Sequence, residues 1–210
     1  QSKCYLDNEK RLLLARRMQT AGIHNMRENI RYYNKKMDGI LEHIIKKMDS
    51  AIGNLKNASS IEEMFMIEAR TRQQYYEAFR KIIKEETGFK FVKRTRRPPK
   101  DEVNAMISFG NTLLYNQFQQ MIWKTSLESR FGIIHGSRRR ETSLNLDFAD
   151  LFKPIIVDRI IFTLVNKHQI KKEHFCMTEN GGVYLNKEGK KIFIEAFEKK
   201  LGSKLMVKGK

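Results

Sequence analysis

Acidic and imidazole side chains in the second half of the chain have the types and spacing for metal chemistry on phosphate. Asp147 and Asp150 are three positions apart, so a helix would place both carboxylates at the edge of one apolar stripe. Carboxylate oxygens select Mg²⁺ or Mn²⁺, and an added histidine such as His135 shifts the preference towards Mn²⁺. Taken singly, each residue has an ordinary alternative, because a lone histidine often packs or caps a helix end and an Asp pair often faces solvent.

A further carboxylate falls where an apolar side chain is expected. Glu68 lies on the same helical stripe as Phe65 and one turn before Arg72. Burying an ionised carboxylate is unfavourable by several kcal/mol unless a counter-charge, hydrogen bonds or a metal compensates. Glu68 therefore either pairs with Arg72 or faces a functional cavity.

Nucleophilic and zinc chemistry have weaker support. Cys176 has only His174 close in sequence and no group to orient it. Cys4 and Cys176 are too few and too far apart for a zinc site or a disulfide framework, which fits a reducing cytoplasm. No apolar stretch reaches the length of a membrane span, so no membrane partner is expected. The chain begins at Gln1 rather than Met, which suggests a piece of a longer protein.

The charge balance points to a polyanionic partner. The chain of 210 residues carries 41 Lys and Arg against 24 Asp and Glu, a formal net charge of +17. Such an excess attracts nucleic acid and makes binding salt-dependent, although a basic solvated surface is an alternative. Because 40% of the residues are hydrophobic, the chain can also bury a folded core.

The apolar periodicity predicts a mainly α protein, read as one helical domain over 1–210. Its regions are an N-terminal part (1–88), an exposed basic connector (89–101) that contains Pro98 and Pro99, and the remainder (102–210). We expect helices over 12–33, 40–55, 60–86, 103–122 and 143–161, with a kink or break at Pro154, and a last helix after Asn186. The Asn180-Gly181-Gly182 turn predicts a small β-hairpin near 174–185.

Local signals fix some ends of these helices. Ser60 and Glu63 form a capping-box pattern, and Asp101 is a suitable N-cap for the central helix. Gly110 lies on the apolar stripe of that helix, where the missing side chain would permit close approach of another helix or a ligand.

Three blocks of sequence resemble the CRISPR-associated integrase family Cas1, the nuclease of spacer acquisition. They read RTRRPPKDEVNAMISFGNTLLYN (94–116), IEARTRQQYYEAF (67–79), and GIIH (132–135) followed by SLNLDFADLFKPIIVDR (143–159). The resemblance covers essentially the whole chain. It implies the helical catalytic domain of the family without the strand-rich N-terminal domain that family members carry.

By this resemblance Glu68, His135 and Asp150 are the ligands of Mn²⁺ or Mg²⁺, with Asp147 an accessory acid. The implied activity is that of a metal-dependent DNA endonuclease and integrase of CRISPR adaptation, which joins the 3′ ends of captured DNA into the repeat array. The implied partners are double-stranded and branched DNA, a second copy in a homodimer, and the small protein Cas2. The basic residues expected to bind DNA phosphates are Arg72, Lys93, Arg94, Arg96, Arg97, Arg138, Arg139 and Arg140.

Two alternatives from other classes stay open. A non-catalytic helical DNA-binding module would use the same basic residues, while its acids would merely pair with arginines. A basic scaffold without a nucleic-acid role would bind DNA regardless of its structure and would have no affinity for metal.

Overall fold

The computed structural model describes residues 1–135 and 142–203, in which helices predominate and the two strands form one hairpin. The chain packs as two compact units. Unit 1 comprises Gln1–Ile82 and Asn111–Ile155, and unit 2 comprises Ile83–Gly110 and Ile156–Lys210. The prediction of a mainly α protein with a small hairpin is confirmed, whereas the single-domain reading stays a prediction.

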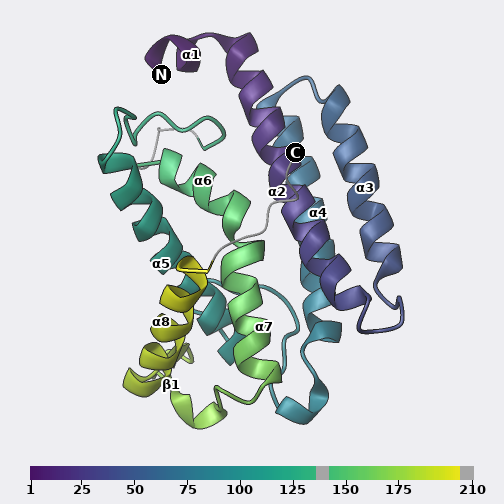
Figure 1. Cartoon of the computed structure of the whole chain (residues 1–210), viewed down its shortest axis with the longest axis vertical. Helices are drawn as coiled ribbons and strands as arrows, with labels where there is room; N and C mark the ends of the chain where they lie inside the picture. The colour runs from purple at the N-terminus through teal and green to yellow at the C-terminus, as the bar shows by residue number, and fades with distance from the viewer. Residues whose placement is uncertain (136–141, 204–210) are drawn as a thin grey trace. The chain divides into compact units, whose positions relative to one another are not determined.

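Figure 1 shows the elements in chain order. They are α1 (Ser2–Leu6), α2 (Asn8–Asn34), α3 (Glu42–Asn57), α4 (Ile61–Ile82), η1 (Glu85–Thr87), α5 (Glu102–Trp123), α6 (Leu144–Phe152), the π-helical η3 (Pro154–Asp158), α7 (Arg159–Asn166), η4 (Lys172–His174), β1 (Phe175–Met177), β2 (Val183–Leu185) and α8 (Lys187–Leu201).

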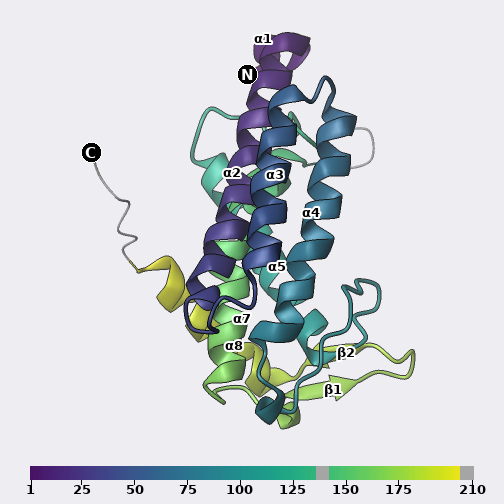
Figure 2. The same ribbon diagram turned by 90° about the vertical axis from the view of Figure 1, so that its right-hand side faces the viewer.

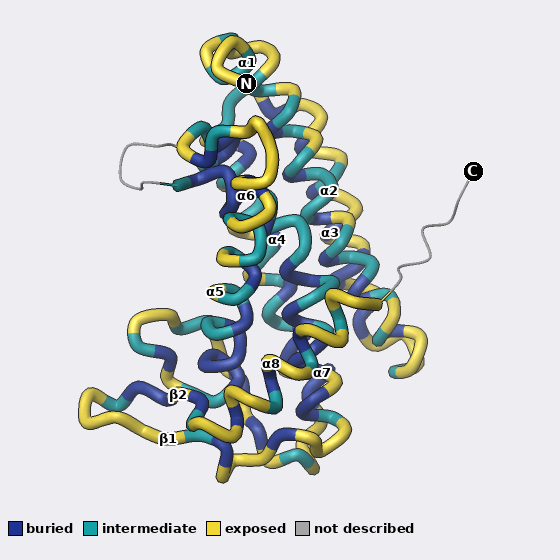
Figure 3. The backbone as a smooth tube through the Cα atoms, turned by 60° about the vertical axis from the view of Figure 1, so that its left-hand side comes forward, coloured by how far each residue is buried: buried dark blue, intermediate teal, exposed yellow. Residues whose placement is uncertain are grey.

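Unit 1 is built around α2, α3 and α4, which lie side by side in Figures 1 and 2, and α6 packs against α2. Along α2, α3 and α4 buried and exposed residues alternate, as the colours of the tube in Figure 3 show. The fully buried side chains at the centre include Ile23, Met26, Ile30, Ile44, Met48, Leu55, Met64, Tyr75 and Phe79. These residues recur at threes and fours along the chain, so the periodicity of the sequence predicted this core.

Both ends of α4 differ in detail from expectation. The Ser60 hydroxyl accepts from the Glu63 N–H at 3.1 Å, as predicted, but the Glu63 carboxylate closes the cap one residue earlier, on the N–H of Ser59. The helix was expected to continue to about Glu86, which is wrong, because α4 ends at Ile82. Lys84 is extended and donates its N–H to Asn166, so the backbone leaves the helical path there.

In unit 2 the connector 89–101 is less exposed than the sequence indicates. Phe89 and Phe91 are buried, and the ring of Phe89 packs edge-on against Phe175 of β1 with centroids 5.9 Å apart. Pro99 is buried and accepts a backbone hydrogen bond from Val183 of β2 at 2.9 Å. The prediction of an exposed connector is therefore wrong for Phe89, Phe91 and Pro99, which contribute to the core of this unit.

Two local predictions for α5 are confirmed. Asp101 caps the helix, since its carboxylate accepts from the N–H of Asn104 at 2.7 Å. A Cβ added at Gly110 would lie 2.6 Å from Cγ1 of Val157 and 2.8 Å from Cζ of Phe193. The missing side chain of Gly110 thus lets Val157 and Phe193 pack closely against α5, which any other residue at this position would prevent.

The rest of unit 2 follows the expected order. Pro154 interrupts the helical run, and the five residues from Pro154 form a π-helical turn before α7. Strands β1 and β2 pair antiparallel with Phe175 opposite Leu185, and Gly181 takes the positive φ of 70° that their turn requires. Asn186 caps α8 by accepting from the N–H of Gly189.

Two features of the surface matter later. In the part of the chain that the structure describes, no helix combines the length and hydropathy that a bilayer span needs. Trp123, the last residue of α5, is 72% exposed.

Candidate metal centre

His135 lies in the irregular segment before α6, and the buried Asp147 of that helix holds it in place. The side chain of Asp147 is 0% exposed, and one of its oxygens lies 2.7 Å from Nδ1 of the imidazole. Because a carboxylate oxygen accepts, Nδ1 carries the proton, and in the neutral ring Nε2 is the nitrogen with a lone pair. Nε2 lies 4.0 Å from Oδ2 of Asp150.

Asp147 also fixes the backbone that carries the ring. Its carboxylate accepts from the N–H groups of Ile133, Ile134 and His135 at 2.5, 3.0 and 3.0 Å. Three consecutive amides converging on one carboxylate form a strong, charge-assisted anchor. The family resemblance implied that Asp147 is an accessory acid beside the metal ligands, and the structure shows an acid that holds the histidine segment.

The same segment is held from two other sides. The buried Ser143 hydroxyl accepts from the N–H of Gly132 and donates to the carbonyl of Arg130, both at 2.9 Å. From α2, the guanidinium of Arg11 donates to the carbonyl of Ile133 at 2.9 Å. The backbone around His135 is thus fixed by side chains of α2 and of the 143–147 stretch.

Asp150 is the acid that faces His135, and a lysine covers its other side. The ammonium of Lys153 forms an ion pair with Oδ1 of Asp150 and donates to the Tyr115 hydroxyl at 2.5 Å. Lys153 also lies over the Tyr115 ring, 4.6 Å from its centroid. An aromatic residue of α5 therefore positions the cation that neutralises Asp150.

Glu68 reaches the centre from α4. It forms an ion pair with Arg72, and both side chains are largely buried, 14% and 16% exposed. One turn earlier, Phe65 packs edge-on against the His135 ring with centroids 5.6 Å apart. The Arg72 pair, one of the two readings of Glu68 that the sequence left open, is therefore confirmed. Glu68 also lines a pocket, and a functional role of that pocket stays a prediction.

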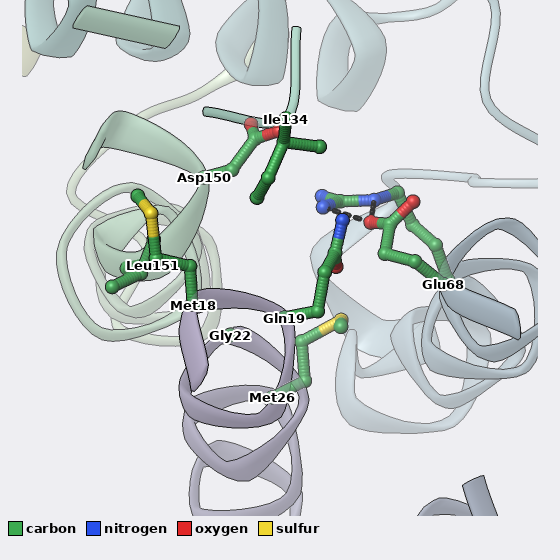
Figure 4. A pocket seen from close by; sticks show the side chains of 9 residues that line it. Met18, Gln19, Gly22, Met26, Glu68, Ile134, Asp150 and Leu151 are labelled. Atoms are coloured by element: carbon green, nitrogen blue, oxygen red, sulfur yellow. Dashed lines mark hydrogen bonds and ion pairs between the residues drawn. The ribbon is translucent and has the colours of Figure 1, made fainter. Parts of the chain in front are cut away.

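That pocket brings the acids from two helices together. It has a volume of about 270 Å³, counting its open mouth, and Figure 4 shows the side chains around it. Glu68 and Arg72 come from α4, Asp150 from α6, and the remaining lining residues are Met18, Gln19, Gly22, Met26, Ile134 and Leu151.

The electrostatics of the pocket are balanced by side-chain cations. Burial of the Asp150 carboxyl would raise its pKa, but the charges of Lys153 and Arg72 outweigh this and hold the pKa below its ordinary value. Burial would likewise lower the pKa of Lys153, yet Asp150 raises it above its ordinary value. Arg72 interacts with both Glu68 and Asp150, so one guanidinium compensates carboxylates from two helices.

The three predicted ligands are thus neighbours, but cations already pair with two of them, Glu68 and Asp150. His135 lies beside Asp150, and Glu68 and Asp150 line one pocket. Over residues 1–135 and 142–203, no group of three His, Cys, Asp or Glu side chains is close enough to hold one ion. The ligand set of Glu68, His135 and Asp150 therefore stays a prediction.

The residues predicted to bind DNA fall into distinct environments. Lys93, Arg96 and Arg97 are exposed. Arg94 is half-buried and donates to Oδ1 of Asn104 and to the Ser108 hydroxyl, both at 2.9 Å, so its contacts are with α5. Arg72 pairs with Glu68. Arg138, Arg139 and Arg140 lie outside the described residues.

Sequence reasoning did not select several residues of this centre. Lys153 could have been recognised three positions after Asp150, where helical spacing allows an ion pair. Gln19 is 8% exposed on the buried side of α2, so it broke the apolar pattern just as Glu68 did on α4. Nothing local marked Ser143 or Arg11, because their partners are distant in sequence.

Comparison with known proteins places the chain and its helical fold in a defined class. The family model described as "CRISPR associated protein Cas1" matches residues 1–199. The chain belongs to the Cas1 family, and the resemblance of the three sequence blocks is confirmed.

Curated relatives match along nearly the whole chain. The chain is 38% identical over 208 residues to a CRISPR-associated endonuclease Cas1 of Thermodesulfovibrio yellowstonii, covering 99% of this chain and 62% of the relative. It is 41% identical over 201 residues to the endonuclease Cas1 of Pyrococcus horikoshii, covering 96% and 59%. The chain thus spans about three fifths of the length of these relatives.

Solved structures share the fold. A Cas1 protein from Thermotoga maritima superposes with a TM-score of 0.85 at 37% identity, covering 95% of this chain and 62% of that one. A casposase bound to an integration product superposes with a TM-score of 0.81 at 20% identity, covering 100% of this chain and 61% of that one. At that identity the second likeness concerns the fold alone.

Proposed function

We propose that this chain carries the metal-dependent catalytic centre of a DNA endonuclease and integrase of CRISPR adaptation. The observation that carries the proposal is the arrangement of His135. Asp147 accepts a hydrogen bond from Nδ1–H, and Nε2 faces Asp150, which lines the same pocket as Glu68. A carboxylate that fixes a histidine in this way is a common arrangement behind metal-binding imidazoles.

The donor set fits a hard divalent cation. Two carboxylates and one imidazole nitrogen suit Mn²⁺ or Mg²⁺, and both carboxylates already face cations, those of Arg72 and Lys153. Glu68, His135 and Asp150 would hold the ion. When bound, it would polarise the scissile phosphate and stabilise the charge that develops there.

The residues of the chain have separate tasks in this proposal. In the neutral imidazole of His135, Asp147 holds the proton on Nδ1 and so leaves the lone pair on Nε2, which faces Asp150. When Glu68 and Asp150 bind the ion, their former partners Arg72 and Lys153 can donate to phosphate oxygens. Tyr115 keeps the Lys153 ammonium beside the pocket. This gives Arg72 the DNA contact that the sequence predicted for it.

The substrates and partners of the whole protein are also proposals. The substrate is double-stranded and branched DNA, and Lys93, Arg96 and Arg97 neutralise its phosphates. Members of the family act as integrases in which the attacking group is a DNA 3′-hydroxyl, so we infer that reaction here. A homodimer that assembles with Cas2 would supply two such centres; a Cas6–RT–Cas1–Cas2 complex contains a protein of this fold.

A second function is supported by one observation. Because Glu68 and Asp150 are each paired with a cation, the acids also suit a non-catalytic DNA-binding module. In that case the pairs would hold the helices together and bind no metal.

Cleavage of branched DNA during a Mn²⁺ titration separates the two functions. We expect metal-dependent cleavage that Glu68→Gln, His135→Ala and Asp150→Asn each abolish, with DNA binding retained. The matched control is Glu62→Gln, an exposed acid in the first turn of the same helix α4. DNA binding without cleavage at any Mn²⁺ concentration would favour the non-catalytic module.

A further inference from the structure

The side chain of Gln19 is a polar group in the pocket that the proposed function does not use. It lies on the buried side of α2, between Ala15 and Ile23, and is only 8% exposed. Figure 4 shows it pointing from α2 into the pocket that Glu68 and Asp150 line.

The Gln19 amide makes no hydrogen bond to any residue within the described ranges. The contrast is Asn29 on the same helix, which is fully buried and donates to the Tyr75 hydroxyl at 2.7 Å. An amide that lines the pocket beside two carboxylates, with no hydrogen-bond partner in the described residues, can bond a group that enters the pocket.

There is space for such a partner next to the amide. A Cβ added at Gly22, one turn after Gln19, would meet no atom within 4 Å. The remaining walls are the apolar side chains of Met18, Met26 and Leu151. The polar atoms of this part of the pocket are therefore those of Gln19 and of the charged residues on α4 and α6.

We propose that Gln19 accepts a hydrogen bond from a water molecule bound to the divalent ion of this centre. The inference rests on the proposed function, because it requires that ion. Mg²⁺ and Mn²⁺ sites built from few carboxylates keep several waters, and those waters donate hydrogen bonds to nearby oxygens. The amide Oε1 supplies such an oxygen without adding charge to a pocket whose two carboxylates are already balanced by two cations.

The test measures binding of Mn²⁺ alone, from the loss of the electron paramagnetic resonance signal of free Mn²⁺. Gln19→Leu removes the acceptor while keeping a similar volume, and we expect about tenfold weaker Mn²⁺ binding. Gln19→Glu keeps an acceptor oxygen and should bind Mn²⁺ at least as tightly as the parent chain. The matched control Gln73→Leu makes the same change at an exposed position of α4 and should leave affinity unchanged.

Thermal unfolding in a chelator distinguishes this role from a packing role. Gln19→Leu removes an amide that makes no hydrogen bond within the described residues, so the metal-free protein should be about as stable as the parent chain. Equal Mn²⁺ affinity of the parent chain and Gln19→Leu would overturn the inference and leave the proposed function standing. Equal loss of affinity in Gln19→Leu and Gln19→Glu would also overturn it, since the acceptor oxygen would then be irrelevant. If Asp150→Asn binds Mn²⁺ as the parent chain does, the proposed centre itself is wrong.

Discussion

The Asp147 carboxylate receives three backbone N–H groups and the Nδ1 of His135, all within one short segment. Four donors on a fully buried acid leave it no lone pair to spare for a metal. Its contribution to the centre is therefore the orientation of His135, and its loss should affect both stability and the protonation of the ring.

Asp147→Asn tests this role. The asparagine amide offers one acceptor oxygen and places an NH₂ group against donors, so we expect the free energy of unfolding to fall by about 3 kcal/mol. The imidazole should shift from the Nδ1–H towards the Nε2–H form, and Mn²⁺ affinity should fall with it. Urea unfolding and ¹⁵N NMR of the ring measure the two effects.

The control for this change is Asp38→Asn. Asp38 is exposed and has a positive φ of 48°, a conformation that asparagine accepts readily. It should show neither effect. An Asp147→Asn protein with parental stability and an unchanged ring would contradict the positioning role.

In the proposed centre Arg72 competes with the metal for the two carboxylates, because it forms an ion pair with Glu68 and interacts with Asp150. Arg72→Met should lower the free energy of unfolding in a chelator by about 3 kcal/mol, since it leaves buried carboxylates without a counter-charge. Added Mn²⁺ should then raise the melting temperature by more than it does in the parent chain. Calorimetry with and without Mn²⁺ measures both shifts.

Arg70→Met is the matched control, at an exposed position of the same helix. It should change neither the stability nor the response to Mn²⁺. If Arg72→Met responded less to Mn²⁺ than the parent chain, the guanidinium would be assisting the ion rather than competing with it.

At the scale of helices, two glycines make a matched pair. A methyl group at Gly110 would overlap Val157 and Phe193, whereas one at Gly53 of α3 would meet nothing within 4 Å. We expect Gly110→Ala to lower the free energy of unfolding by about 1–3 kcal/mol and Gly53→Ala to raise it by about 0.5–1 kcal/mol. Chemical unfolding followed by circular dichroism measures both changes. Equal changes in the two variants would contradict the close packing of Val157 and Phe193 against Gly110.

The connector 89–101 gives a second prediction at this scale. Replacing Arg96 and Arg97 by alanine should weaken binding to all duplex sequences alike and lower the slope of log affinity against log salt by about 0.9 per lost contact. Arg94→Met should instead lower stability, because Arg94 holds Asn104 and Ser108 of α5. Titrations at several salt concentrations decide this, and an unchanged slope for the double variant would remove Arg96 and Arg97 from the DNA interface.

Most elements could be predicted from the sequence because their causes are local. Apolar spacing predicted the long helices, Asp101 predicted the start of α5, and Asn180-Gly181-Gly182 predicted the hairpin turn. The end of α4 could not be predicted in this way, because Lys84 leaves the helix to bond Asn166, 82 positions away. The buried ring of Phe89 in the connector was missed for the same reason, since it packs against Phe175 of β1.

The candidate centre was predictable in its residue types but not in its contacts. A charge on an apolar stripe revealed Glu68, and helical spacing paired it with Arg72. The contact of Lys153 with Tyr115 joins residues 38 positions apart, and that of Arg11 with Ile133 joins residues 122 positions apart. No local pattern encodes such separations, so the sequence could name the acids but could not show which cations cover them.

At the scale of the whole molecule, metal binding and ordered integration should be separable. Glu68, His135 and Asp150 all belong to unit 1, so we expect Mn²⁺ binding by this chain alone. Strand transfer at a fixed spacing needs two centres held apart on DNA, which we expect to require a dimer and Cas2.

Sedimentation and strand transfer into a repeat-bearing duplex, with and without added Cas2, measure this separation. The Asp150→Asn variant is the control, because it measures any strand-transfer product that forms without an intact metal centre. Correctly spaced integration by the chain alone would contradict the prediction, because this chain would then carry the assembly surfaces itself.

Trp123 is the single tryptophan of the chain, and its indole is largely exposed at the end of α5. An indole in water already emits at long wavelength, so unfolding should shift its fluorescence very little. Intrinsic fluorescence would therefore under-report the melting of the core. The same exposure makes the indole open to quenching by dissolved iodide. A partner that covered this end of α5 would protect it, and the loss of quenching would reveal that contact without any added label.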